Sequence, residues 1–263
     1  MPDTNHTYNT AIIKGSALIP ETRTLLQHWQ PGESPADFGR RVQQEDLLGR
    51  ATDFRTQELV RKVFARRYLR PEDTPAQTLK LVANAKLPPR TFAEIAFIFS
   101  CHSDALLYDF TSQFYWPAVK RGRSAVGSND VRDFLHEAIE AGHLQRQWSQ
   151  EVTQRVASGI LNFLFDLGFL GRYHRGQREI VTYRMSVEGA ACLARTLHEA
   201  GVTDSTLPDH PDWSLFGLSR DEVIDKLTDL GETRGLIVQA AGAVVSITWN
   251  VKSLEELLDV LAR

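Results

Sequence analysis

The chain has 263 residues, of which 42% are hydrophobic and 24% are charged, so it is long enough to bury a sizeable core and form two or three compact units. These values exclude a tail or a short peptide. The formal net charge of -3 does not by itself indicate a polyanionic partner, so the distribution of charge along the chain is more informative than its sum.

An N-terminal helix-turn-helix-like unit is expected over residues 10–70, after frayed residues before Thr10. A first helix ends near Trp29, and Ser34 with Pro35 opens a second as cap and first-turn proline. A third helix is predicted over 53–69. From 40 to 70 the chain carries nine basic and four acidic residues, a net charge of +5. The basic residues expected to point largely outward from the third helix are Arg55, Arg61, Lys62, Arg66 and Arg67.

A central helical core is expected over residues 71–125, with helices at 76–85, 91–100 and 103–114 after the breaks at Pro71 and Pro75. Its aromatic cluster is expected to pack in the core rather than to stack on bases: Phe110, Phe114, Tyr115 and Trp116. The loop that follows holds Arg121 and Arg123, which suit phosphate contacts or are simply solvated.

The range 149–167 predicts one long helix, capped by Ser149. Apolar residues at helical spacing form one stripe along it: Val152, Val156, Ile160, Phe163, Leu164 and Leu167. The opposite face is expected to be free for a partner. It carries side chains that can contact base edges or phosphates: Gln150, Thr153, Gln154, Arg155, Ser158 and Asn162.

A β-hairpin is expected from 172 to 184, turning at 175–178 and returning through β-preferring residues 180–183. Its four arginines are opposed by one glutamate, Glu179: Arg172, Arg175, Arg178 and Arg184. With a shorter helix at 131–139 and a covering helix at 186–201, residues 126–202 have the order of a winged helix-turn-helix that contacts nucleic acid. The plainer alternative is a packing or dimerisation module with solvated edge arginines.

Residues 203–263 are expected to form a C-terminal helix-hairpin-helix unit behind a polar linker at 203–216. From 204 to 263 five basic residues face eleven acidic ones, giving -6. This charge is wrong for DNA, so the unit is expected to dock another protein. Together the segments predict a mainly α fold, with a helical bundle core, helix-turn-helix and winged-helix units, and small β-hairpins.

Two cysteines, Cys101 and Cys192, lie far apart and indicate neither a disulfide framework nor a zinc site, which fits a reducing cytoplasm. The N-terminus lacks the pattern of a signal peptide. The most apolar run, 92–99, contains Glu94 and is far shorter than the ~20 residues of a membrane span. A cytoplasmic protein without a membrane partner is therefore expected.

Motifs for chemistry are missing from the sequence. It has no phosphate-binding loop, no dinucleotide fingerprint and no serine elbow, so we expect neither an enzyme nor a cofactor. His136 and His143 are seven residues apart on the chain, which on a helix separates their imidazoles by ~10 Å, too far to share one metal ion. No metal site is expected.

The chain resembles the BrxA family, a component of the BREX bacteriophage-defence systems, and the matching blocks reach to about Arg195. They occur in the family's order: Tyr8, Lys14, Gly15, Glu21, Thr22, Trp29, Leu47, Leu48, Gly49, Arg55, Arg67, Tyr68, Asp109, Phe110, Trp148 and Ser149. The resemblance implies an accessory, non-catalytic protein that binds double-stranded DNA. It also implies possible partners encoded in the same cluster, namely a DNA methyltransferase, a phosphatase-like protein and ATPases.

Two other functions remain open on the sequence. A protein-protein adaptor within the defence complex would use the basic helix and the acidic end as opposite docking faces. An RNA-binding protein of the helical antitermination type would prefer structured or single-stranded RNA over duplex DNA.

Overall fold

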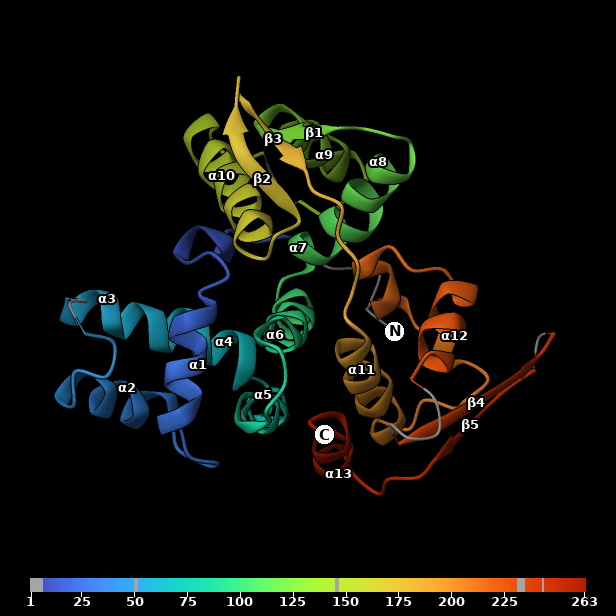
Figure 1. The fold of residues 1–263 in the computed structure, drawn as a ribbon. Coiled ribbons are helices and arrows are strands. Elements are labelled where there is room, and N and C mark those ends of the chain that lie inside the picture. Colours follow the sequence, from blue (N-terminus) through green and yellow to red (C-terminus); the bar gives the residue numbers. More distant parts are fainter. Residues whose placement is uncertain (1–6, 50–51, 145–146, 231–234, 243) are drawn as a thin grey trace. The chain divides into compact units, whose positions relative to one another are not determined.

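A computed structural model describes residues 7–49, 52–144, 147–230, 235–242 and 244–263. The fold is mainly α with two small antiparallel sheets, which confirms the predicted fold class (Figure 1). The chain divides into two compact units: unit 1 comprises Met1–Lys80 and Phe97–Tyr183, and unit 2 comprises Leu81–Ala96 and Arg184–Arg263. The sequence-based division into four segments stays a prediction.

Unit 1 begins with a short 3-10 helix and a set of α-helices: η1 (Ala11–Lys14), α1 (Ile19–His28), α2 (Pro35–Gln44), α3 (Asp53–Glu58), the π-helical η2 (Leu59–Phe64) and α4 (Ala65–Tyr68). Two further helices are divided between the units: α5 (Thr74–Asn84) and α6 (Pro89–Ser103). The second part of unit 1 contains α7 (Ala105–Asp109), the π-helical η3 (Phe110–Tyr115), α8 (Trp116–Lys120), β1 (Ala125–Gly127), α9 (Ser128–Glu140), α10 (Gln150–Asp166), β2 (Leu170–His174) and β3 (Gln177–Ile180).

The N-terminal helices form where the sequence predicts them. The Ser34 hydroxyl accepts from the Asp37 amide at 3.1 Å and caps α2. The third predicted helix is the run α3, η2 and α4, whose middle turns are π-helical. The core of this part is aromatic and fully buried: Trp29, Phe38, Phe64 and Tyr68.

The second part of unit 1 has a three-stranded antiparallel sheet in the order β1-β3-β2. β1 was missed by the sequence analysis because three residues give no usable periodicity. β3 ends at Ile180, so the predicted return strand over 180–183 is wrong, and Arg184 lies outside the hairpin. Figure 1 shows the hairpin β2-β3 beside α10, and Tyr115 donates its hydroxyl hydrogen bond to the Phe169 carbonyl at 2.8 Å.

The predicted aromatic cluster is part of the core, because Phe110, Tyr115 and Trp116 are buried. The frayed N-terminus is a wrong prediction for Tyr8, which is only 4% exposed. The Tyr8 amide donates to the His143 carbonyl at 2.8 Å, and the Tyr8 hydroxyl donates to Asp109 Oδ2 at 2.8 Å. The N-terminal segment is therefore anchored both on the connection between α9 and α10 and on the end of α7.

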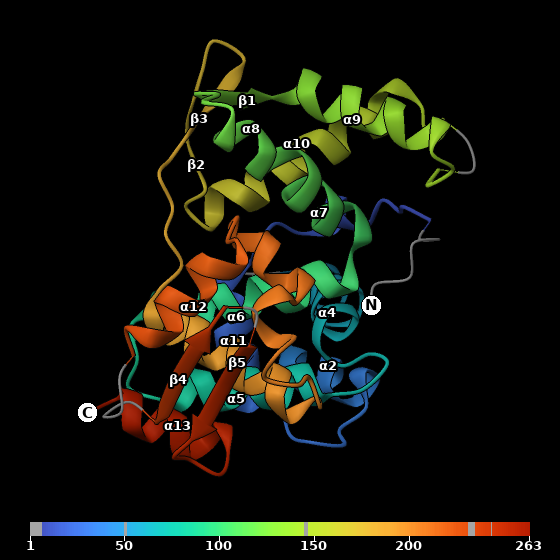
Figure 2. The ribbon, with the colours of Figure 1, turned by 90° about the vertical axis from the view of Figure 1, so that its right-hand side faces the viewer.

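Unit 2 consists of α11 (Val187–Glu199), η4 (Leu207–Asp209), η5 (Pro211–Phe216), α12 (Arg220–Thr228), β4 (Leu236–Ala241), β5 (Val244–Trp249) and α13 (Leu254–Leu261), together with 81–96. Figure 2 shows β4 and β5 as one hairpin, as predicted. The polar linker predicted at 203–216 is wrong, because η4 and η5 bury Leu207, Trp213 and Phe216. These large apolar side chains make that segment part of the core of unit 2.

Candidate nucleic-acid interface

Helix α10 presents its apolar stripe to the core and its polar side chains outward. Ser149 caps it, since the Ser149 hydroxyl accepts from the Val152 amide at 3.3 Å. Val156, Ile160 and Leu164 are fully buried. The side chains on the other face are exposed or half-buried: Gln150, Thr153, Gln154, Arg155, Ser158 and Asn162.

The sequence predicts that the outward face of α10 is free, and this is wrong in part, because an N-terminal arm (residues 8–16) lies against it. A Cβ added at Gly159 would meet the Ile12 carbonyl oxygen at 3.1 Å, so glycine permits the close approach of η1. The arm and α10 leave a groove of about 350 Å³ between them. We call this the arm groove. Its lining is Ile12, Ile13, Lys14, Gly15, Ser16, Arg55, Gln154, Arg155, Ser158, Gly159 and Asn162.

The arm groove combines cations that are distant in the sequence. Arg55 of α3 donates to the Lys14 carbonyl at 3.1 Å, and Arg155 of α10 lines the same groove. Among the described residues that line it, none is acidic. Outside this lining, the Glu58 carboxylate accepts from Lys14 Nζ at 3.1 Å, and Asp166 accepts from the Ala17 amide at 3.3 Å. Such a site favours an anion with several separated charges.

The remaining cations of the predicted basic helix have different surroundings. Arg61 and Lys62 are exposed and line a second groove of about 520 Å³ with Phe54 and Arg70. Lys62 Nζ bonds to Glu58 at 3.1 Å, and Lys62 together with Lys14 lowers the pKa of that carboxyl. Arg66 is half-buried and donates to the Ser103 carbonyl at 3.2 Å.

Arg67 is not an outward-facing cation, which corrects the sequence-based interpretation. Its side chain is buried, with 8% of the residue exposed. Its guanidinium donates to the carbonyls of Gly15 at 2.9 Å and Ser16 at 2.8 Å, and lies over the Phe163 ring at 5.2 Å. Arg67 therefore connects the N-terminal arm to α10 from the buried side, and it offers very little surface to a phosphate.

The hairpin β2-β3, which the sequence predicts to be a wing and which we call the wing, is tight, and its two-residue turn is Arg175-Gly176. Both residues have positive φ, 48° and 85°, as a type I′ turn requires. Arg172 and Arg175 are exposed there. Arg178, in contrast, is held: it donates to Asn162 Oδ1 at 2.7 Å and to the Gly171 carbonyl at 3.2 Å.

The Arg178 guanidinium also lies over two aromatic rings. Its guanidinium lies 4.3 Å from the centroid of Phe165 and 5.7 Å from that of Tyr173. Through these contacts Arg178 joins the hairpin to the outward face of α10, so it positions the wing.

The two loop arginines also differ. Arg121 is exposed at the turn after α8. Arg123 forms an ion pair with Asp130 and lies over the Phe114 ring at 5.8 Å. Asp130 in turn accepts from the Gly127 amide at 2.7 Å at the start of α9. Arg123 therefore also has a local structural role.

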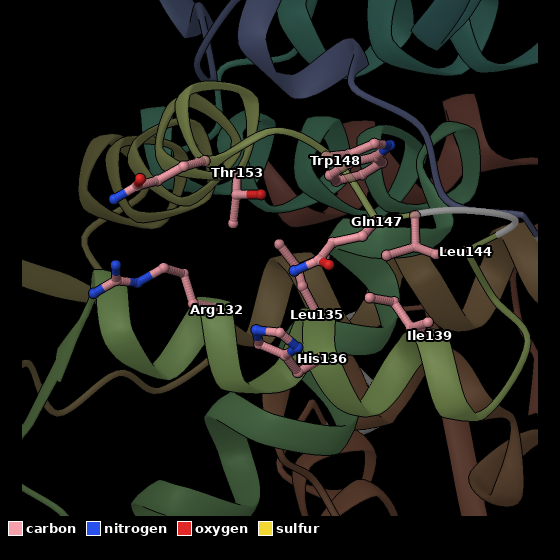
Figure 3. Close-up of a pocket in the computed structure, with 9 residues that line it drawn as sticks. Arg132, Leu135, His136, Ile139, Leu144, Gln147, Trp148 and Thr153 are labelled. Atoms are coloured by element: carbon pink, nitrogen blue, oxygen red, sulfur yellow. The ribbon is translucent and has the colours of Figure 1, made fainter.

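The first turn of α10 borders a separate cavity, which we call the helix-pair pocket. Figure 3 shows side chains of α9 facing those of the α9-α10 connection and α10 across it. Its volume is about 220 Å³. The lining is Arg132, Leu135, His136, Ile139, Leu144, Gln147, Trp148, Gln150 and Thr153. Two predicted contact residues, Gln150 and Thr153, thus face this pocket, whereas Gln154 and Arg155 face the arm groove.

Sequence reasoning placed Arg55 and Arg155 on different units and gave Lys14 no role in binding. The contact that unites them, between Ile12 and Gly159, joins positions far apart in the chain and leaves no local pattern. Asn162 was named only as one of several polar residues. Its specific contact is with Arg178 at 2.7 Å.

With this geometry established, comparison with known proteins identifies the family. The BrxA family model matches residues 6–204. The chain belongs to the BrxA family. Membership makes it a component of a BREX bacteriophage-defence system. The match includes the N-terminal arm, the arm groove and the wing, and ends in unit 2 before η4.

One solved structure supports the fold. The crystal structure of an uncharacterized protein from Magnetospirillum magneticum has a TM-score of 0.61 and 16% identity to this BrxA-family chain. The alignment covers 80% of this chain and 99% of that one. At this identity the likeness concerns the fold alone. Among curated proteins, no match was found.

Two features are absent from the residues that the structure describes. None of the helices combines the length and hydrophobicity that crossing a bilayer requires. Nor do the histidine, cysteine and acidic side chains that the structure describes form a group of three able to hold a metal ion. His210 and Asp212, close in the sequence, lie 3.6 Å apart in η5 and its cap.

Proposed function

We propose that this BrxA-family protein binds double-stranded DNA without a chemical step of its own. The arm groove carries the proposal, because it places Lys14, Arg55 and Arg155 in one cleft without an acidic lining residue. These cations come from three separate elements, η1, α3 and α10, so the groove can offer several positive charges to one phosphate backbone.

The proposed interface is organised around α10. The groove cations bind phosphates on one side, and the wing residues Arg172 and Arg175 bind phosphates on the other. Further exposed cations, Arg61, Lys62 and Arg121, extend the positive surface of unit 1. The half-buried Arg66 and the ion-paired Arg123 would add to it electrostatically. Counterion release from the DNA then supplies most of the affinity.

Side chains for base contacts are fewer than those for phosphates. Gln150 and Gln154 are exposed on the first turns of α10, where an amide can bond to adenine in the major groove. Thr153 is half-buried between them. Gln154 Nε2 also bonds to Ser128 Oγ at 3.5 Å, which restrains it at the N-terminus of α9. A modest sequence preference is therefore proposed.

The experiment is a binding series with purified, nuclease-treated protein on a duplex DNA, from low to high salt, with matched RNA as competitor. Log affinity should fall linearly with log salt, with a slope of about -0.9 for each phosphate neutralised. DNA should be preferred over RNA. Stronger binding to single-stranded or structured RNA would replace the proposal with the antitermination-like function.

Unit 2 favours a second function, an adaptor for another protein. Exposed acidic side chains lie along two of its helices: Asp221, Glu222 and Asp225 on α12, and Glu255, Glu256 and Asp259 on α13. A DNA duplex would be repelled by this surface. The partner would be another component of the defence system with a basic surface. Co-purification with such a component in nuclease-treated lysate, weakened by salt, would support the adaptor.

A further inference from the structure

The helix-pair pocket lies between α9 and the start of α10 and is separate from the arm groove. Leu135 and Leu144 form buried apolar walls, with 4% and 6% exposure, and Ile139 and the half-buried Trp148 add to them. At about 220 Å³ the pocket is smaller than the about 300–1,000 Å³ typical of drug-sized ligands. It suits one ring system.

The first turn of α10 forms one side of this pocket. Val156 and Ala157, one turn further along, are fully buried against the core. Thr153 lies on the same face of α10, one turn before Val156 and Ala157, and it lines the pocket. Water in a space with mostly apolar walls finds few hydrogen-bond partners, so its displacement by a flat apolar body is favourable.

The rim of the pocket supplies hydrogen-bonding groups. Arg132 and His136 come from α9, and the amides of Gln147 and Gln150 come from the connection and from α10 (Figure 3). A ligand with a flat aromatic body and both donors and acceptors at its edge satisfies the apolar walls and the rim together. Nucleobases have this chemistry, and side-chain amides and guanidinium groups are their usual partners.

We infer that the helix-pair pocket binds a single nucleobase, stacked or packed against Trp148 and bonded at its edge by the rim. The base has two possible sources with the same chemistry. It can belong to a free nucleotide, or it can be a base turned out of a DNA strand bound beside α10. The second source rests on the proposed DNA binding, and the first does not.

Two kinds of probe are used. Binding of each of the four 5′-mononucleotides is measured by calorimetric titration. Unstacking of a base is measured with a duplex carrying 2-aminopurine, whose fluorescence rises when the base unstacks. Ile139→Trp fills the pocket from α9, and Gln147→Ala removes one rim amide from an exposed position. Ile224→Trp makes the same enlargement at a half-buried site on α12 and is the matched control. Thermal unfolding checks that each variant is folded.

The wild-type protein should bind at least one mononucleotide or raise the 2-aminopurine fluorescence of the duplex. Ile139→Trp should weaken the affinity for that probe by about tenfold or more, because its side chain fills a space the size of one ring. Gln147→Ala should weaken it less, and Ile224→Trp should leave it unchanged. A response from the mononucleotides identifies the free nucleotide as the source. A response from the labelled duplex alone identifies the turned-out base.

Two results would overturn the inference. One is the absence of any mononucleotide binding, together with equal 2-aminopurine signals for wild type and Ile139→Trp. The other is indole binding as tightly as the nucleotides, because the rim would then have no role in selecting a base. Duplex affinity is measured separately in the salt series, so equal 2-aminopurine signals count against the inference only where the duplex is bound. Where the duplex is not bound, the mononucleotide titration alone decides, and failure of this inference stays distinguishable from failure of the proposed function.

Discussion

At the scale of single residues, arginines that look equivalent in the sequence have different tasks in the structure. Arg155 and Arg175 are exposed, whereas Arg67 is buried under the N-terminal arm and Arg178 is held between two rings. The sequence could not distinguish exposed arginines from buried ones. An amphipathic pattern shows which residues are polar, but it does not show which distant carbonyl or ring each side chain contacts. Carbonyls at Gly15 and Ser16 allow Arg67 to be buried as a charged group.

Replacing Arg67 tests its structural role. Arg67→Ala leaves carbonyls of the arm without a donor and removes the contact with Phe163, so the free energy of unfolding should fall by about 2–4 kcal/mol. Urea unfolding measures this. The matched control is Arg61→Ala, at an exposed position in η2, which should change stability by no more than about 0.5 kcal/mol. Equal effects of the two variants would show that Arg67 does not hold the arm.

Asp104 gives a pH-dependent prediction. Its side chain is buried, Oδ1 has no hydrogen-bond partner, and burial raises the pKa of the carboxyl, although Arg66 acts in the opposite direction. With the folded pKa above the unfolded value of about 3.9, the folded state binds more protons, so stability falls as pH rises from about 4. Asp104→Asn cannot ionise and should be more stable than wild type at pH 7.

The measurement for Asp104 is chemical unfolding of both proteins across a pH series. The advantage of Asp104→Asn should shrink as the pH falls, and it should be smallest below about 3.9, where the wild-type carboxyl is protonated in the unfolded state as well. A variant that is less stable than wild type at pH 7 would contradict this account. It would mean that attraction to Arg66 and Arg67 outweighs the cost of burial.

At the scale of elements, the predictions that succeeded rest on local signals. Ser149 caps α10, and the apolar stripe that follows has helical spacing, so both ends and the buried face could be predicted. The hairpin was predicted in the right place, but its return strand was predicted too far along the chain, since the strand observed is Gln177–Ile180. β-preferring residues such as Val181 and Thr182 continue past the last pairing of β3.

The wing makes a quantitative prediction. If Arg172 and Arg175 each bind a phosphate, the variant with Arg172→Ala and Arg175→Gly should reduce the magnitude of the salt slope by about 1.8. Glycine suits position 175, where φ is 48°, so the turn itself should be retained or strengthened. Arg178→Lys keeps the charge but loses the planar contacts, so it should lower affinity with a smaller change in slope. An unchanged slope in the double variant would remove the wing from the interface.

At the scale of the whole molecule, the distribution of charge and the arm groove together give the central claim. The basic segment over 40–70 belongs to unit 1, and the segment 204–263 with its net charge of -6 belongs to unit 2. This separation could be predicted by counting. The position of Arg55 and Arg155 in one groove could not be predicted, because it depends on the N-terminal arm crossing α10 at Gly159. The buried η4-η5 segment escaped prediction because its prolines resemble those of a linker.

The most direct test compares the salt dependence of duplex binding for wild type, for Arg55→Ala with Arg155→Ala, and for Lys86→Ala with Lys252→Ala. The control pair removes the same charge from exposed positions in unit 2. The groove pair should reduce the magnitude of the slope by about 1.8 and weaken binding across all sequences, while the control pair should match wild type. Equal slopes for all three proteins would contradict the claim that the arm groove binds the phosphate backbone.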